Sequence, residues 1–149
     1  MKKIALSACL LGKSCRYDGT DNRNDLLISL LEGNEIVPFC PEDFAFGTPR
    51  PTMDLVKQDG KIRAISNETG EDLSEPVIAY AKGFFDTHCD IDLFIGKDRS
   101  PSCGVCSARV YSSEKKLISS NAAGVMAQEA IWRQIPARDA EDYIKDTKG

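Results

Sequence analysis

Short apolar runs alternate with amphipathic stretches along the chain, a pattern typical of strands alternating with helices. Apolar density predicts buried strands over residues 2–8, 34–39 and 91–96. Helical spacing of apolar residues predicts helices over residues 25–33, 74–89 and 121–134, and a short polar terminal helix over 137–149. We therefore predict an α/β fold, with residues 1–149 forming a single compact domain in which helices flank a largely parallel sheet.

Turn-forming residues divide the chain between these elements. Residues 54–66 predict a β-hairpin turned at Asp59-Gly60, and residues 107–120 predict a second hairpin. Residues 40–54 contain three prolines and are predicted to form an irregular loop rather than a helix. The candidate N-caps of the helices are Asn22 or Asn24, Ser74 and Asn121.

Composition narrows the range of partners. The 149 residues are 42% hydrophobic and 28% charged, as in an ordinary globular protein, and the net charge of −4 disfavours nucleic acid as a partner. No segment has the length of apolar sequence that a membrane span needs, and Ser7, Gly12 and Lys13 interrupt a superficially signal-like N-terminus. We expect a cytoplasmic protein that binds a small molecule rather than a membrane.

Six cysteines are the main candidates for chemistry, because thiols in a reducing compartment more often bind metals or catalyse reactions than form disulfides. Cys9, Cys40 and Cys103 each follow a predicted strand. Ligands of parallel α/β sheets bind beyond the carboxyl ends of the strands, so these thiols are expected to converge there. Converging thiolates favour an iron–sulfur or zinc centre.

Four sequence blocks in order, "SACLLG...CRYDG", "CPE...GTPRP...D", "GEDLSEP" and "RSPSCG", resemble the TudS-like thiouracil desulfidase family over nearly the whole chain. The resemblance implies a 4Fe-4S cluster held by three cysteines with one iron open to substrate, and such clusters are lost in air. Matched residue by residue, the ligands are Cys9, Cys40 and Cys103. Glu42 is then the acid/base, and Ser102 holds the substrate or the attacking water.

The resemblance implies a hydrolytic, non-redox reaction that converts thiouracil to uracil and hydrogen sulfide. Glu42 removes a proton from water and later returns one to the ring nitrogen. Desolvation beside Phe39, Phe44 and Phe46 is expected to raise the pKa of Glu42 toward neutrality. Arg50 and Arg99 lie in loops at the same edge and are candidates for binding the substrate, including a phosphate of a nucleotide.

Two other functions remain open from the residues alone. The first is a non-catalytic protein that stores or senses zinc or iron through its thiols. The second is a dithiol redox protein using Cys103-Gly-Val-Cys106, although a strand rather than a helix is predicted to follow this motif. Cys15 is interpreted as a small buried side chain or a free thiol near the site, and Cys89 as a packing residue at the end of a helix. Tyr80 and Trp132 are interpreted as core residues. Oligomeric state is not predicted.

Overall fold

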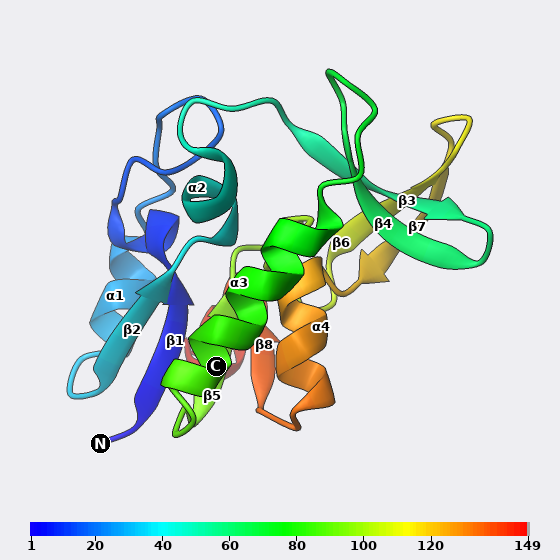
Figure 1. Cartoon of the computed structure of the whole chain (residues 1–149). Coiled ribbons are helices and arrows are strands. Elements are labelled where there is room, and N and C mark those ends of the chain that lie inside the picture. The colour runs from blue at the N-terminus through cyan, green and yellow to red at the C-terminus, as the bar shows by residue number, and fades with distance from the viewer. Residues whose placement is uncertain (149) are drawn as a thin grey trace.

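The computed structural model describes residues 1–148 and shows strands and helices in alternation (Figure 1). The strands are β1 (Lys3–Ser7), β2 (Glu35–Phe39), β3 (Met53–Gln58), β4 (Lys61–Ser66), β5 (Leu93–Gly96), β6 (Ala108–Ser112), β7 (Leu117–Ala122) and β8 (Ala137–Asp139). The helices are the 3-10 helix η1 (Ala8–Leu11) and α1 (Asp25–Leu30), α2 (Pro41–Phe46), α3 (Ser74–Thr87), α4 (Val125–Trp132) and α5 (Ala140–Lys148). Among these residues, no helix is both long and apolar enough to cross a membrane.

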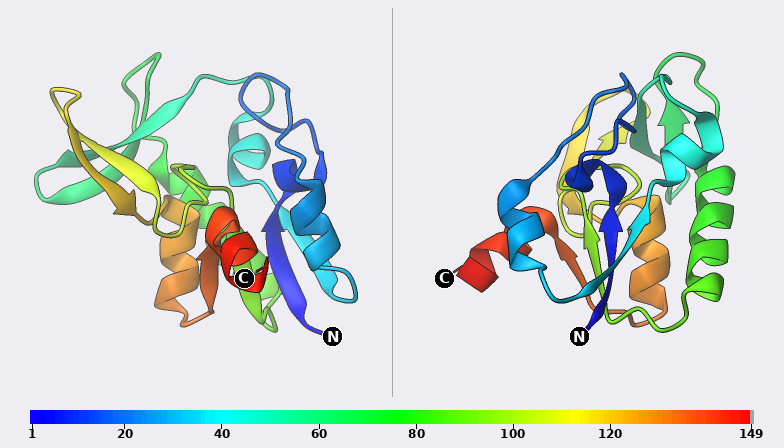
Figure 2. Two further views of the ribbon diagram at one scale, coloured as in Figure 1. Left: turned by 180° about the vertical axis from the view of Figure 1, so that it is seen from behind. Right: turned by 90° about the vertical axis from the view of Figure 1, so that its left-hand side faces the viewer.

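The first sheet has the strand order β2-β1-β5-β8, and all its described pairings are parallel. Its central strand β1 is apolar on both faces because both are covered. Ile4 and Leu6 pack with α1 and α5, whereas Ala5 packs in the core that includes α3 and α4. Figure 2 shows these two helix pairs on opposite sides of the sheet. The predicted α/β fold with a parallel sheet is confirmed.

The second sheet has the order β4-β3-β6-β7 and lies beside the first (Figure 1). Its outer pairs are the two predicted hairpins, which are confirmed as antiparallel. Asp59 and Gly60 turn the first hairpin with positive φ angles of 50° and 78°. The hairpins join through a parallel β3–β6 pairing, which makes this sheet mixed.

Two elements differ from the sequence prediction. Residues 41–46 form helix α2 where an irregular loop was expected. Pro41 occupies the first turn, where the missing N–H removes no helical bond, and acidic side chains follow it near the positive end of the helix dipole. Strand β8 was not predicted, because its three residues sit inside a segment with helical spacing.

The predicted caps are partly wrong. Asn24 caps α1 as expected, and its side chain accepts a hydrogen bond from the Leu27 N–H. Ser74 instead lies in the first turn of α3, where its hydroxyl accepts from the Ala64 N–H and ties the helix to β4. Asn121 belongs to β7, and α4 begins only after Gly124.

Candidate active site

A pocket of about 590 Å³ lies at the carboxyl ends of β1, β2 and β5, where these strands are neighbours in the first sheet. Loops from distant parts of the chain meet there. Its lining includes four thiols and three arginines, namely Cys9, Cys15, Cys40, Cys103, Arg16, Arg50 and Arg99. The structure therefore brings the three candidate ligands together and adds Cys15 to them. In the described chain all six cysteines are free thiols.

Cys9 and Cys40 directly follow adjacent parallel strands. Cys9 lies in η1, and the Asn22 side-chain amide donates a hydrogen bond to its sulfur at 3.6 Å. Burial raises the pKa of the Cys9 thiol, and the Asn22 contact opposes this rise. Cys40 is the N-cap residue of α2, and its N–H donates to the Tyr80 hydroxyl at 3.2 Å. Both cysteines thus lie just beyond the ends of adjacent strands, and the Cys40 sulfur donates to the Cys15 carbonyl at 3.8 Å.

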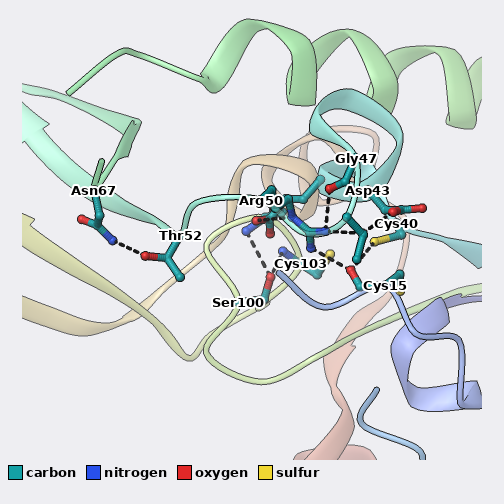
Figure 3. Close-up of polar contacts among 12 residues, drawn as sticks. Cys15, Cys40, Asp43, Gly47, Arg50, Thr52, Asn67, Ser100 and Cys103 are labelled. Atoms are coloured by element: carbon teal, nitrogen blue, oxygen red, sulfur yellow. Dashed lines mark hydrogen bonds and ion pairs between the residues drawn. The ribbon is translucent and has the colours of Figure 1, made fainter. Parts of the chain in front are cut away.

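Cys103 reaches the pocket from a longer connection, residues 97–107, which we call the Cys103 loop. The Ser100 hydroxyl accepts from the N–H groups of Ser102 and Cys103 at 3.2 and 3.0 Å (Figure 3). Cys103 itself is only 7% exposed. Burial raises the pKa of its thiol well above the ordinary value, and the negative charges of Glu42 and Cys40 raise it further.

The thiols are close enough to influence one another. Burial raises the pKa of Cys15 to about 12, and the neighbouring Cys40 adds to the rise. Buried thiols with raised pKa values, here Cys15 and Cys103, keep their protons unless a cation compensates the thiolate charge. Soft sulfur donors of this kind fit an iron–sulfur cluster, whose several irons take ligands at separate corners. Over residues 1–148, no group of three or more His, Cys, Asp or Glu side chains is arranged for a single metal ion.

Glu42 lies in the first turn of α2 and faces the same pocket. Its Oε2 accepts a hydrogen bond from the Ser102 hydroxyl at 3.0 Å. Burial raises the pKa of the Glu42 carboxyl, whereas the charge of Arg50 and the bond from Ser102 lower it. The structure thus joins the predicted acid/base to the predicted substrate-binding serine, although they are 60 residues apart in sequence.

The aromatic residues named around Glu42 have different surroundings. Phe39 lines the pocket and is buried. Phe46 lines a small neighbouring cavity of about 160 Å³ together with Glu42. Phe44 is 77% exposed and rests against Tyr80, so its expected contribution to desolvation is wrong. It lies on the outward face of the helix that the sequence did not predict.

Arg50 ties together the loops around the pocket rather than extending into solvent (Figure 3). Its Nη1 donates to the Gly47 carbonyl at 3.1 Å and to the Thr48 hydroxyl at 2.8 Å. Its Nη2 donates to the Cys15 carbonyl at 2.8 Å. Arg99, by contrast, lies at the surface end of the pocket, and its half-exposed side chain pairs with Glu141 at 3.1 Å.

Asp139 is a residue that sequence reasoning missed. This buried carboxylate at the end of β8 accepts hydrogen bonds from the N–H groups of Val105 and Cys106, each at 2.8 Å. It also accepts from the Ser107 hydroxyl at 2.9 Å, and Ser107 in turn accepts from the Arg99 N–H. Asp139 therefore fixes the second half of the Cys103 loop, and no local signal in the sequence marks it.

The first half of the Cys103 loop is fixed by close backbone packing. A Cβ atom on Gly124 would lie 2.5 Å from the Ser102 carbonyl carbon, and one on Gly96 would lie 1.8 Å from the Cys103 oxygen. The first N–H groups of α4 donate to the carbonyls of Pro101 and Ser102. Gly96 and Gly124 lie inside elements predicted from the sequence, and glycine at such positions is a sequence signal for a close backbone contact.

Two further expectations about side chains are resolved. Tyr80 does more than pack, because its hydroxyl accepts the Cys40 N–H. Trp132, expected in the core, is 79% exposed, and Cys89, expected to pack, is also exposed, so both expectations are wrong. Cys103 and Cys106 also differ, since Cys103 is buried in the pocket whereas Cys106 is exposed and its sulfur donates to the Asn121 carbonyl at 3.7 Å.

Fold and site together define an α/β protein with a thiol-rich pocket and a buried carboxylate at the carboxyl edge of its parallel sheet. Residues 4–142 match the 2-thiouracil desulfurase family, and the chain belongs to that family. The resemblance carried by the four sequence blocks is thereby confirmed.

Two individual proteins show how far the likeness extends. The uncharacterized protein YbbK of Bacillus subtilis (strain 168) is 29% identical over 157 residues, which cover 95% of this chain and 99% of YbbK. The solved structure of the [4Fe-4S]-dependent thiouracil desulfidase TudS is similar with a TM-score of 0.75 and 28% identity, covering 99% of this chain and 96% of TudS. The likeness therefore extends over nearly the whole length of this chain.

Proposed function

We propose that this chain is an iron–sulfur-dependent desulfidase that hydrolyses a thiolated pyrimidine to its oxo form. Thiouracil and water give uracil and hydrogen sulfide, with no change of oxidation state. The observation that carries the proposal is the convergence of Cys9, Cys40 and Cys103 on one pocket with the bonded pair Glu42 and Ser102. Family membership and the likeness to TudS support the same chemistry.

Cys9, Cys40 and Cys103 are the residues that would hold a 4Fe-4S cluster, leaving one iron without a protein ligand. When bound, the cluster supplies a Lewis acid for the thiocarbonyl sulfur. Cys15 borders the same pocket and adds a fourth thiol nearby. We propose that residues 1–149 act as one iron–sulfur domain in the cytoplasm, where reducing conditions preserve the thiols.

The chain's own acid/base chemistry centres on Glu42. We assign its carboxylate to accept a proton from water as the water attacks the thiocarbonyl carbon, and to return a proton to the ring nitrogen, whose own proton leaves with the sulfide. Burial raises the pKa of this carboxyl, which makes it a stronger base than an exposed glutamate. Ser102 donates a hydrogen bond to Glu42 and holds its orientation, or passes this bond to the substrate.

The charged groups around the pocket indicate which class of substrate it binds. Arg99 sits at its surface end and is proposed to contact a larger substituent, such as the phosphate of a nucleotide. The chain as a whole carries a net charge of −4, which disfavours nucleic acid as the substrate. A small thiolated base, nucleoside or nucleotide is therefore the proposed partner.

The test is turnover by anaerobically reconstituted protein. We expect loss of the thiocarbonyl absorbance of 2-thiouracil or 4-thiouracil, with one sulfide released per oxo base formed. Glu42→Gln should retain iron and lose about 100-fold or more in kcat, the usual contribution of a general base. Iron-loaded protein that leaves both bases intact contradicts the proposal. A colourless protein holding one zinc per chain after the same reconstitution would favour the metal-storage alternative.

A further inference from the structure

One buried polar atom near the pocket has no hydrogen-bond partner. Within residues 1–148, the Arg50 Nε is the single buried side-chain nitrogen or oxygen that makes no hydrogen bond, although the Arg50 side chain is only 5% exposed. A buried charged donor left unpaired is costly, so native proteins rarely keep one without a reason. The residue lines the pocket, which suggests that a ligand completes the bond.

Most of the remaining Arg50 guanidinium is already committed. Its Nη atoms donate to the carbonyls of Gly47 and Cys15 and to the Thr48 hydroxyl, which locks the side chain between two loops (Figure 3). A guanidinium bound in this way is held in one orientation. Besides one N–H of Nη2, only the Nε–H is left to bind a ligand.

An unused acceptor lies beside this donor. Glu42 Oε1 is 3.7 Å from Arg50 Nε, beyond the range of a hydrogen bond, while Oε2 is engaged by Ser102. Both residues line the pocket. The two side chains therefore present one donor and one acceptor side by side to whatever enters.

We infer that Arg50 Nε and Glu42 Oε1 together recognise a lactam edge, in which a ring N–H adjoins an oxo group. Glu42 accepts the ring N–H, and Arg50 donates to the neighbouring oxygen. The inference rests on the proposed desulfidase function and defines which heterocycles the site selects. Arg50 is thereby a specificity residue for the base, rather than the phosphate ligand that its charge alone suggested.

Both thiouracil isomers carry this edge. In 2-thiouracil, N3–H lies between the thiocarbonyl and the 4-oxo group, and in 4-thiouracil it lies between the thiocarbonyl and the 2-oxo group. The same Glu42 and Arg50 contacts therefore serve either isomer. A thiocytosine presents an unprotonated ring nitrogen and an amino group there, which reverses both hydrogen-bond polarities, and the site should reject it.

The experiment compares two ligands of which one lacks the oxygen facing Arg50. Pyrimidin-2-one also lacks the hydrogen on one ring nitrogen of uracil, so the part of the preference that is due to Arg50 is read from the Arg50 variants. Dissociation constants of uracil and pyrimidin-2-one, which lacks the 4-oxo group, are measured by calorimetry on iron-loaded protein. The wild type should bind uracil about 10- to 100-fold more tightly, the range expected for a hydrogen bond to a charged donor. In Arg50→Lys and Arg50→Gln this preference should fall to about 3-fold or less by loss of that donor. Arg109→Lys, at an exposed arginine outside the pocket, should keep it.

Kinetics provide the second measurement. Pyrimidine-2-thione should show a higher KM than 2-thiouracil with the wild type, and similar KM values with Arg50→Lys. Equal binding of uracil and pyrimidin-2-one by the wild type overturns the inference even if the Arg50 variants fail to fold. Equal weakening of both ligands by Arg50→Lys also overturns it, because Arg50 would then act only through the loops. The ratio of dissociation constants is measured without turnover, so failure of this inference can be distinguished from failure of the desulfidase proposal.

Discussion

The pocket is built from two segments that are held in different ways. The Cys103 loop is fixed by buried contacts from remote elements, including Asp139 on β8 and Gly124 before α4. The segment of residues 40–50, which we call the α2 segment, is held by contacts within itself and by hydrogen bonds with a few residues outside it, namely Cys15, Tyr17, Tyr80 and Ser102. The Cys103 loop is therefore held by more contacts from other elements than the α2 segment, which carries the acid/base group Glu42.

We expect the largest effect from a substitution that adds a side chain where the backbone packs against the Cys103 loop. In Gly124→Ala the new methyl group would meet backbone atoms of Pro101 and Ser102 at 2.5–2.7 Å. We expect a loss of about 3 kcal/mol in the free energy of unfolding, measured by urea denaturation, together with lower iron retention. Gly83→Ala in α3 is the control, since its Cβ meets nothing within 4 Å and should be neutral or stabilising. Equal free energies of unfolding for Gly124→Ala and Gly83→Ala would contradict the inference that the Cys103 loop is tightly packed against Gly124.

The next effect is expected at Asp139. Asn in its place keeps one acceptor oxygen and puts an NH₂ group against the N–H of Val105 or Cys106. Leaving such a donor unpaired costs about 1–3 kcal/mol, and the half-life of the reconstituted iron centre should shorten in parallel. The exposed Asp142→Asn provides the matched control. A normal half-life of the iron centre in a destabilised Asp139→Asn protein would show that the contacts of Asp139 with the Cys103 loop do not control iron retention.

A pH-dependent effect is expected where the Cys103 loop begins. Burial and nearby carboxylates raise the pKa of Asp98 from its ordinary 3.8 to about 6. Between these values the folded state binds more protons than the unfolded state, so stability is fully present below about pH 4 and is lost as the pH rises through about 6. The loss should be on the order of 1 kcal/mol after solvent screening. Asp98→Asn should remove this component, and parallel pH profiles for both proteins would contradict the assignment.

The smallest effect is expected in the α2 segment. Tyr80→Phe removes the acceptor of the Cys40 N–H without creating a cavity. The expected cost is about 1 kcal/mol, since the site is half-buried and water can replace the hydroxyl. Tyr143→Phe, on α5 and outside the pocket, should cost less. If Tyr80→Phe costs as much as Asp139→Asn, the proposed difference between the two segments is wrong.

The sequence predicts the features that depend on local pattern. The apolar runs identify β1, β2 and β5, and the rule for parallel sheets places Cys9, Cys40 and Cys103 at one edge. Asp59-Gly60 specifies its hairpin turn. Four blocks of residues were enough to predict the family, now confirmed.

Other features depend on long-range packing that a local pattern does not contain. Helix α2 is not predicted from the sequence because proline usually interrupts helices. Pro41, however, lies in the first turn, where a helix tolerates proline. The second sheet arises from the parallel β3–β6 pairing, whose partners are about 55 residues apart. The bonds of Asp139 to the Cys103 loop likewise join residues more than 30 positions apart, as do those of Arg50 to Cys15.

Single Cys→Ser variants test most directly our proposal that three of the six cysteines hold an iron–sulfur cluster. Iron and acid-labile sulfide are counted after anaerobic reconstitution. Wild type, Cys89→Ser and Cys106→Ser should each hold about four irons per chain, as a 4Fe-4S cluster requires, while Cys9→Ser, Cys40→Ser and Cys103→Ser should lose most of them. Full iron content in Cys103→Ser, or its loss in Cys106→Ser, would contradict the account.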